Sequence, residues 1–183
     1  MPGAVKALEM AQGEFGKLPW NTLFDDTIKT AEDGFKVSPR LAKLIALDYH
    51  PGLKTFPASS TYFFPAGLPL KEGTVRRNKK LAKTLRGIAE KGSDYLLKGE
   101  VAEKIVEAVN NAEINPGQMS LEDLASYEPV TREPVCGLYH EKRICGMAPP
   151  SSGGVNVYQI LKMLEGFNLS QYAPDSVEFA NLY

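Results

Sequence analysis

Apolar residues that recur every three or four positions are the feature that most constrains what this chain can fold into. Over residues 1–50 they form separate runs, and glycine or proline stands at the end of these runs. This spacing puts apolar side chains on one face of an α-helix, and glycine and proline commonly end helices. Helices are therefore predicted over residues 1–50, with apolar faces formed by Ala4, Val5, Leu8, Ala11, Phe15, Leu23, Phe24, Ile28, Ala31, Phe35, Leu41, Leu44, Ile45 and Leu47.

Polar residues of the kind that cap helices mark where several segments begin. Ser38 and Asn78 each stand before an apolar run, and Ser120 is followed three residues later by Asp123. A serine or asparagine side chain at such a position accepts a hydrogen bond from a free backbone N–H of the first turn. The Ser120–Asp123 pair is a weak capping box, because Asp replaces the usual Glu or Gln. Further helices are therefore predicted over residues 78–128.

Residues 51–77 differ from their surroundings, because prolines and glycines interrupt their apolar runs. Such a composition is typical of loops, and a long loop in a compact domain is commonly functional or mobile. We therefore expect an irregular excursion here, followed by the basic run 76–80 as the solvated start of the next helix. The interrupting residues are Pro51, Gly52, Pro57, Pro65, Gly67, Pro69 and Gly73.

The spacing of apolar residues changes again in the last third of the chain. Residues 134–147 are typical of a β-hairpin of two short strands, with His140 and Glu141 at the turn. Residues 151–183 return to helical spacing. The prediction is therefore a mainly α fold with a small β-hairpin (α+β), in a single domain that extends over the whole chain.

Cys136 and Cys145 are the two cysteines, and they lie nine residues apart. In a hairpin that turns at His140 and Glu141 they lie near each other, and a disulfide is then open to them if their Cα atoms come within about 7 Å. Metal binding is not expected, because the two histidines have no ligand spacing to the cysteines. We expect free thiols, since the helices supply ample apolar surface without a cross-link.

Composition and charge exclude several classes of function. Lysine and arginine number 21 and aspartate and glutamate 22, for a net charge of −1. This balance favours neither nucleic acid nor an anionic membrane as a partner. The apolar runs are too short to span a bilayer, and the first residues lack the pattern of a signal peptide. We expect no cofactor and no metal.

Two prolines, two serines and two glycines precede the helix predicted near residue 151. A serine nucleophile is not indicated, because G-x-S-x-G is absent and neither His50 nor His140 is placed to act as its base. A phosphate loop is not indicated either, because the G-K-[ST] ending is missing. We favour a close-packed strand-to-helix junction in which the serines cap and the glycines allow close approach. An anion or oxyanion site at the helix N-terminus is the alternative. The residues concerned are Pro149, Pro150, Ser151, Ser152, Gly153 and Gly154.

Several blocks of the sequence, taken in order, resemble the gamma-glutamyltranspeptidase family. Ordered blocks that extend over nearly the whole chain are far more specific than the serine–glycine run alone. They correspond to the central part of the family's large subunit. The blocks are Met1–Gly3, Gly16–Trp20, Ile28–Phe35, Leu81–Leu85 with Ile88 and Ala89, Gly99–Ala102, Leu121–Tyr127 and the PPSSGG run.

The resemblance implies the αββα fold of N-terminal nucleophile hydrolases, of which this chain is expected to be an incomplete helical lobe. In that family a precursor cuts itself, and the new N-terminal threonine of the small subunit is the nucleophile. No threonine here begins a Thr-x-His processing signature. By the resemblance, the arginine that binds the substrate carboxylate precedes Met1, and the serine and glycine pairs that hold the substrate and the oxyanion lie beyond Tyr183. No catalytic and no substrate-binding residue is therefore expected in this chain, and Ser151 and Ser152 are not that serine pair.

For the complete protein the resemblance implies γ-glutamyl transfer or hydrolysis with glutathione-type substrates, in the periplasm or outside the cell. This chain alone is expected to be inactive. Its expected partners are the rest of the large subunit, the small subunit and a second copy bound through apolar helix faces. Such faces carry Val157, Ile160, Leu161 and Leu164, or Val5, Leu8 and Phe15, or Val177, Phe179, Ala180 and Leu182.

Two other functions stay open. The chain could serve as a stand-alone helical interaction module derived from the family, or it could be a piece of a related acylase with another acyl donor. Residues that select the donor are expected outside this chain, so its sequence does not choose between donors.

Overall fold

The computed structural model describes residues 2–182, and its contacts divide the chain into two compact units. The first unit ends at Pro129 and the second begins at Val130. The sequence predicted a single domain. Because the contacts form two units, each unit is described by itself. Residues 127–134, which include this boundary, contain no helix or strand. Met1 and Tyr183, the ends of two predicted segments, lie outside the described residues.

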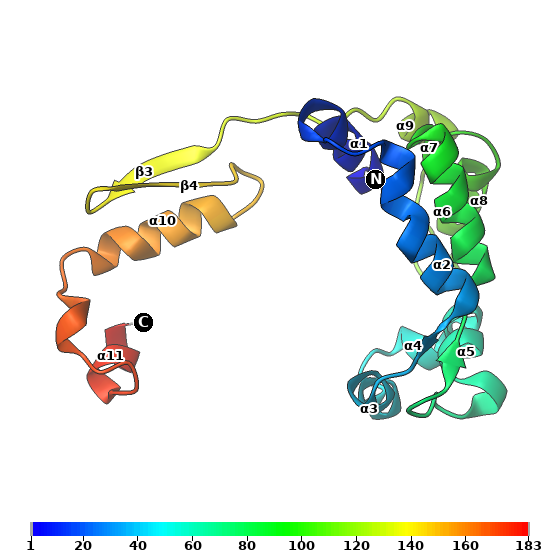
Figure 1. Ribbon diagram of the computed structural model, residues 1–183, viewed down its shortest axis with the longest axis horizontal. Coiled ribbons are helices and arrows are strands. Elements are labelled where there is room, and N and C mark those ends of the chain that lie inside the picture. The colour runs from blue at the N-terminus through cyan, green and yellow to red at the C-terminus, as the bar shows by residue number, and fades with distance from the viewer. Residues whose placement is uncertain (1, 183) are drawn as a thin grey trace. The chain divides into compact units, whose positions relative to one another are not determined.

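The first unit opens with a helical segment whose ends match the sequence signals (Figure 1). Its elements are α1 (Ala4–Phe15), the 3-10 helix η1 (Trp20–Phe24) and α2 (Asp25–Asp33). As predicted, α1 ends at Gly16 and α2 ends at Gly34. Gly34 has a φ of +87°, a backbone conformation that favours glycine. The prediction that Phe35 lies on the helix face is wrong: the chain leaves the helix at Gly34, and Phe35 begins a strand.

Residues 51–77 are more regular than predicted. They contain α4 (Gly52–Thr55), α5 (Pro57–Phe63), η2 (Pro65–Gly67) and β2 (Val75–Arg76). Pro57 and Pro65 stand in the first turn of their helices, where the fixed φ of proline fits and its missing N–H leaves no bond unmade. Pro57 and Pro65, two of the prolines that suggested irregular structure, therefore start short helices. Strand β2 pairs antiparallel with β1 (Phe35–Lys36).

The remaining helices of this unit are α3 (Pro39–Leu47), α6 (Lys79–Lys91), α7 (Asp94–Leu97), α8 (Gly99–Asn110) and α9 (Leu121–Ala125). Three of them, α3, α6 and α9, begin directly after the predicted caps Ser38, Asn78 and Ser120. The side-chain oxygens of Ser38 and Asn78 each accept a hydrogen bond from the backbone N–H three residues later, at 3.2 and 2.9 Å. Ser120 and Asp123 complete the capping box in front of α9. Start signals in the sequence therefore located α3, α6 and α9.

Small clusters of buried apolar residues form the core of the first unit. One of them includes Phe64 and Leu70, so residues 51–77 contribute to the core. A second cluster joins α2 to α6, and a third joins α7, α8 and α9. The clusters are Val37, Ile45, Phe64 and Leu70; Ile28, Ala31 and Ala82; and Leu97, Ala102 and Leu124.

Polar side chains fasten the helices of this unit where the clusters are small. The Trp20 indole N–H donates to the Ile88 carbonyl oxygen at 3.0 Å. The Glu9 carboxylate accepts a 3.0 Å bond from the Ser93 backbone N–H. The Lys6 ammonium donates to the Tyr127 carbonyl oxygen at 2.8 Å. These bonds tie α1 and η1 to segments far away in the sequence.

The second unit contains a hairpin and helices, as predicted. Its elements are β3 (Val135–Tyr139), β4 (Lys142–Gly146), α10 (Gly153–Leu164), η3 (Leu169–Gln171) and α11 (Val177–Leu182). The hairpin turns at His140 and Glu141, and His140 takes a φ of +49° there. With its helices and two small two-stranded sheets, the chain has the predicted mainly α fold with a β-hairpin.

No apolar side chain of the second unit is buried within its described range. The predicted stripe on α10 is divided: Leu161 and Leu164 are half-buried, while Val157 and Ile160 are 50% and 44% exposed. The face of α10 that packs on the hairpin instead includes Gly154 and Tyr158. Helix α10 therefore has one apolar face on the hairpin and another without cover.

Candidate functional site

The run from Pro149 to Gly154 joins β4 to α10 through a tight turn, as the sequence predicted. The peptide bond between Pro149 and Pro150 is cis. The Ser151 backbone N–H donates to the Ala148 carbonyl oxygen at 3.2 Å. The helix begins two residues later, so the hairpin and α10 are joined by a short junction.

The prediction that the serines of this junction cap α10 is wrong for Ser152. Ser152 occupies the N-cap position, and its side chain makes no capping bond. Its φ of −80° and ψ of −18° are already helical, whereas a capping residue is normally extended. The Ser151 hydroxyl accepts only a long 3.4 Å contact from the Gly153 N–H. The junction is thus held mainly by its backbone.

The glycine pair has unequal roles in this packing. A Cβ atom on Gly154 would lie 2.4 Å from the Met147 carbonyl oxygen and 2.7 Å from the Gly146 carbonyl carbon. A Cβ atom on Gly153 would meet nothing closer than the Ser151 hydroxyl at 3.7 Å. The predicted close approach of two backbones therefore depends on Gly154, and Gly153 has room for a side chain.

Two strand glycines that the sequence analysis did not single out complete the contact. A Cβ atom on Gly137 would lie 2.1 Å from the Tyr158 ring, and one on Gly146 would lie 2.5 Å from the Gly154 Cα atom. Glycine inside a strand commonly marks a close approach of another element. That signal was present in the sequence and could have predicted that α10 packs on this side of the hairpin.

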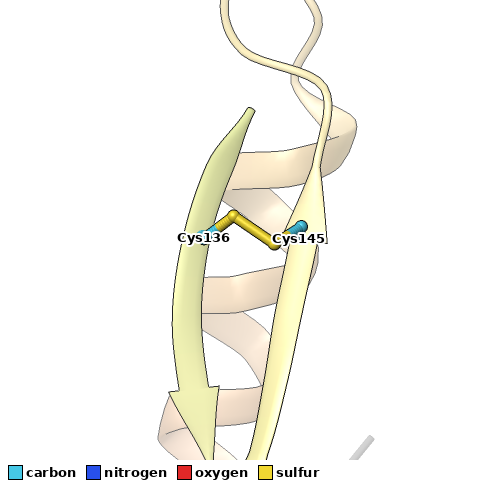
Figure 2. Close-up of a disulfide and its surroundings, with 2 residues drawn as sticks. All are labelled: Cys136 and Cys145. Carbon is cyan, nitrogen blue, oxygen red and sulfur yellow. A yellow bond between two sulfur atoms is a disulfide. The ribbon is translucent and has the colours of Figure 1, made fainter. Parts of the chain in front are cut away.

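The prediction of free thiols is wrong, because Cys136 and Cys145 form a disulfide across the hairpin. Figure 2 shows the bridge between the two strands. The register pairs the two cysteines directly, and their Cα atoms are 4.2 Å apart. This spacing is close to that of a non-hydrogen-bonded pair in an antiparallel sheet, where side chains approach each other most closely. The turn at His140 thus determines the pairing, independently of how much apolar core the helices supply.

A carboxylate connects the hairpin turn to the C-terminal end of α10. The His140 backbone N–H donates to Glu165 Oε1 at 2.6 Å, and the Lys162 ammonium donates to the other oxygen of the carboxylate. The Lys162 hydrogen bond and then the His140 N–H lower the pKa of Glu165 below the usual range for glutamate. Lys162, Glu165 and the turn therefore form a second attachment between α10 and the hairpin.

The described residues contain no hydroxyl group that is paired with a histidine base. The hydroxyls of Thr30, Thr55 and Thr84 donate to carbonyl oxygens four residues earlier. His50 Nδ1 accepts from the Gly52 N–H at 3.2 Å, and no histidine ring bonds a hydroxyl group anywhere in residues 2–182. Nor does that range contain a group of three or more potential metal ligands. No helix within it is both long and apolar enough to cross a bilayer.

A family comparison identifies the chain. All of it, residues 1–183, matches the family model for gamma-glutamyltranspeptidase. The chain belongs to the gamma-glutamyltranspeptidase family. The glutathione hydrolase proenzyme of Escherichia coli strain K12 is 36% identical to it over 177 residues. The solved gamma-glutamyltranspeptidase of Helicobacter pylori is 34% identical, with a TM-score of 0.89. The cephalosporin acylase of Bacillus halodurans is 29% identical, with a TM-score of 0.86.

The chain spans only part of each of these gamma-glutamyltranspeptidase relatives. The match covers 97% of this chain and 30% of the E. coli proenzyme. It covers 100% of this chain in both solved structures, but 51% of the H. pylori chain and 34% of the acylase chain. These likenesses confirm the predicted fold, an incomplete helical part of the N-terminal nucleophile hydrolase architecture. The anion-site alternative for residues 149–154 stays a prediction.

Proposed function

We propose that this chain is a structural part of a longer enzyme that transfers or hydrolyses the γ-glutamyl group of glutathione-type substrates. The observation that carries the proposal is the family match, which runs from residue 1 to residue 183 while the chain spans 30% of the E. coli glutathione hydrolase proenzyme. Among the described residues no histidine ring bonds a hydroxyl group, and the hydroxyl–carboxylate pair of Ser120 and Asp123 forms a capping box. Alone, the chain therefore has no γ-glutamyl transfer activity.

In the complete enzyme this chain works together with the rest of the large subunit and with the small subunit. The uncovered face of α10 supports this role, because an apolar surface that its own unit leaves open is suited to cover by another segment. The disulfide supports a periplasmic or extracellular location, since disulfides persist in oxidising compartments.

An acylase with a different acyl donor is the second candidate for the complete protein. The TM-score of 0.86 with the cephalosporin acylase of Bacillus halodurans favours it. The two candidates differ in the acyl group that the enzyme removes, and both place the reacting groups outside this chain. To distinguish them, the coding region is extended on both sides and expressed, and the product is assayed with a γ-glutamyl anilide and with a cephalosporin.

The test of inactivity uses the purified 183-residue chain and a γ-glutamyl anilide that releases a coloured amine. Release at the rate of the buffer blank is expected, because positioned reacting groups supply most of the rate enhancement and none is present. Release above the blank that persists in the purified chain contradicts the proposal.

A chimera tests the structural role directly. This chain replaces the matched segment of the E. coli proenzyme, and a deletion of the same segment is the control. We expect the chimera to mature and to release the amine, and the deletion to do neither. A chimera that folds as a soluble particle and still fails to mature contradicts the role, because the swapped segment then does not fit its partners.

A further inference from the structure

The β3–β4 hairpin has two faces of different character. Side chains alternate along a strand, so positions 136 and 145 face away from positions 137 and 146. Gly137 and Gly146 face α10, because Cβ atoms there would meet Tyr158 and Gly154. The opposite face, called the outer face below, carries Cys136, Leu138, Arg143 and Cys145. In Figure 2 the bridge between the cysteines lies on the near side of the strands, with a helix behind them.

The two sulfur-bearing residues on the outer face differ in exposure. Cys145 is exposed, whereas Cys136 is half-buried. A thiolate breaks a disulfide by attacking one sulfur and releasing the other, so access decides which sulfur is attacked. The difference in exposure favours attack at Cys145 and release of Cys136.

A cation shares the outer face with the two cysteines. Arg143 lies two residues before Cys145 on the same face, and diagonally across the ladder from Cys136. Such diagonal neighbours are about 7–8 Å apart at Cα, within reach of a long side chain. Arg143 is exposed, and no described acidic residue forms an ion pair with it. A cation in this position stabilises a departing thiolate and speeds exchange.

The attachments that hold the hairpin on α10 do not involve the bridge. They are the Gly137–Tyr158 and Gly146–Gly154 contacts on the opposite face, and the His140–Glu165 hydrogen bond at the turn. The strands also pair at every position from Val135 to Tyr139. These attachments do not depend on the bridge, so they remain available when it is broken.

We propose that Cys136 and Cys145 form a thiol–disulfide exchange site on the outer face, with Cys145 as the attacked residue. One thiolate of a dithiol reductant bonds to Cys145 Sγ, the bridge breaks, and Cys136 leaves as a thiolate that takes a proton from water. The second thiol of the reductant then displaces Cys145 and closes its own disulfide. Two electrons pass to the protein, and the reductant is oxidised. This site is independent of the acyl transfer proposed for the complete enzyme.

Reduction of the folded chain is the first test. The 183-residue chain is incubated with dithiothreitol without denaturant, quenched with acid, alkylated and analysed by mass spectrometry, with circular dichroism in parallel. We expect both cysteines to be alkylated while the helical spectrum is retained. A bridge that opens only in unfolding concentrations of urea, or a spectrum that is lost on reduction, overturns the proposal.

The attacked sulfur is identified with a monothiol. Glutathione at low excess is allowed to form the mixed disulfide, which is trapped by acid and located by peptide mapping. We expect about tenfold more glutathione on Cys145 than on Cys136, because attack follows access. Equal labelling, or an excess on Cys136, contradicts the assignment.

Two matched variants test the part played by Arg143. Arg143→Gln removes a charge from the outer face, and Lys142→Gln removes one from the neighbouring position on the opposite face. We expect Arg143→Gln to slow reduction by dithiothreitol by about threefold at low salt, and Lys142→Gln to leave the rate near that of the parent. If dithiothreitol reduces both variants at the same rate, Arg143 does not stabilise the departing thiolate.

Discussion

Two serines in this chain show that backbone conformation decides whether a side chain can cap a helix. Ser120 is extended, with ψ of 163°, and its hydroxyl accepts the Asp123 backbone N–H at 3.1 Å. Ser152 stands at the same kind of position in a helical conformation, and its hydroxyl accepts no such bond. Residue type alone predicted caps at both places. The chain direction before the helix distinguishes them, and that direction is set by the turn that follows Met147.

The first prediction compares these two serines. Ser152→Ala should leave the free energy of unfolding nearly unchanged, because no capping bond is lost. Ser120→Ala should lower it by about 1 kcal/mol, since a backbone N–H loses its partner. Urea unfolding of both variants, followed by circular dichroism, measures the difference. A loss at Ser152 as large as that at Ser120 means that the Ser152 hydroxyl caps α10 in solution.

At the scale of the element, the start of α9 links a capping box to pH. The Asp123 carboxylate accepts 2.8 Å bonds from the Ser120 N–H and the Ser120 hydroxyl. The backbone bond and then the hydroxyl bond lower the pKa of Asp123 below its ordinary value of 3.8. Folding therefore favours the ionised carboxylate. Its contribution to stability is complete above the ordinary value and is lost as the pH falls through the lowered one.

The second prediction follows from that sign. Asp123→Asn should destabilise the chain at about pH 6, and the difference from the parent should shrink as the pH falls below the ordinary aspartate pKa of 3.8 and the parent's carboxylate becomes protonated. Urea unfolding across this range measures it. Glu122→Gln, which removes a charge from the same turn and leaves the box intact, is the control. A difference that stays constant with pH shows that the Asp123 charge does not stabilise the box.

At the scale of the whole molecule, both units leave apolar helix faces without cover. Leu8 and Phe15 of α1 are 63% and 75% exposed, and Met163 of α10 is 67% exposed. Monomeric proteins rarely leave apolar side chains together in large patches, so exposed faces of this kind commonly mark association sites. In the proposed complete enzyme other segments cover them. In the isolated chain, these faces can be covered by a second copy of the same chain.

The third prediction is therefore that the isolated chain self-associates at micromolar concentration, most simply as a symmetric dimer. Ile160→Lys should weaken association by placing a charge on the uncovered face of α10, and Gln159→Lys, at an exposed neighbouring position, should not. Sedimentation velocity measures the particle mass of all three proteins. A compact monomer at every concentration contradicts this prediction and favours the stand-alone module over the enzyme part.

The sequence by itself determined the features that depend on neighbouring residues. Caps at Ser38, Asn78 and Ser120, helix ends at Gly16 and Gly34, and the hairpin turn all lie where local signals placed them. Backbone hydrogen bonding and glycine conformations act within a few residues, so these features can be read from short stretches. The ordered blocks over the whole chain likewise identified the family before the fold was known.

Tertiary structure alone decided the features that depend on residues far apart in the sequence. The disulfide is different: the hairpin turn that the sequence predicted sets the register that pairs Cys136 with Cys145, and only the expectation of free thiols was wrong. Gly154 is required and Gly153 is not, because only Gly154 meets the backbone of β4. Phe64 and Leu70 place residues 51–77 in the core, although prolines had suggested a loop. Packing, unlike capping, depends on which surfaces meet in space.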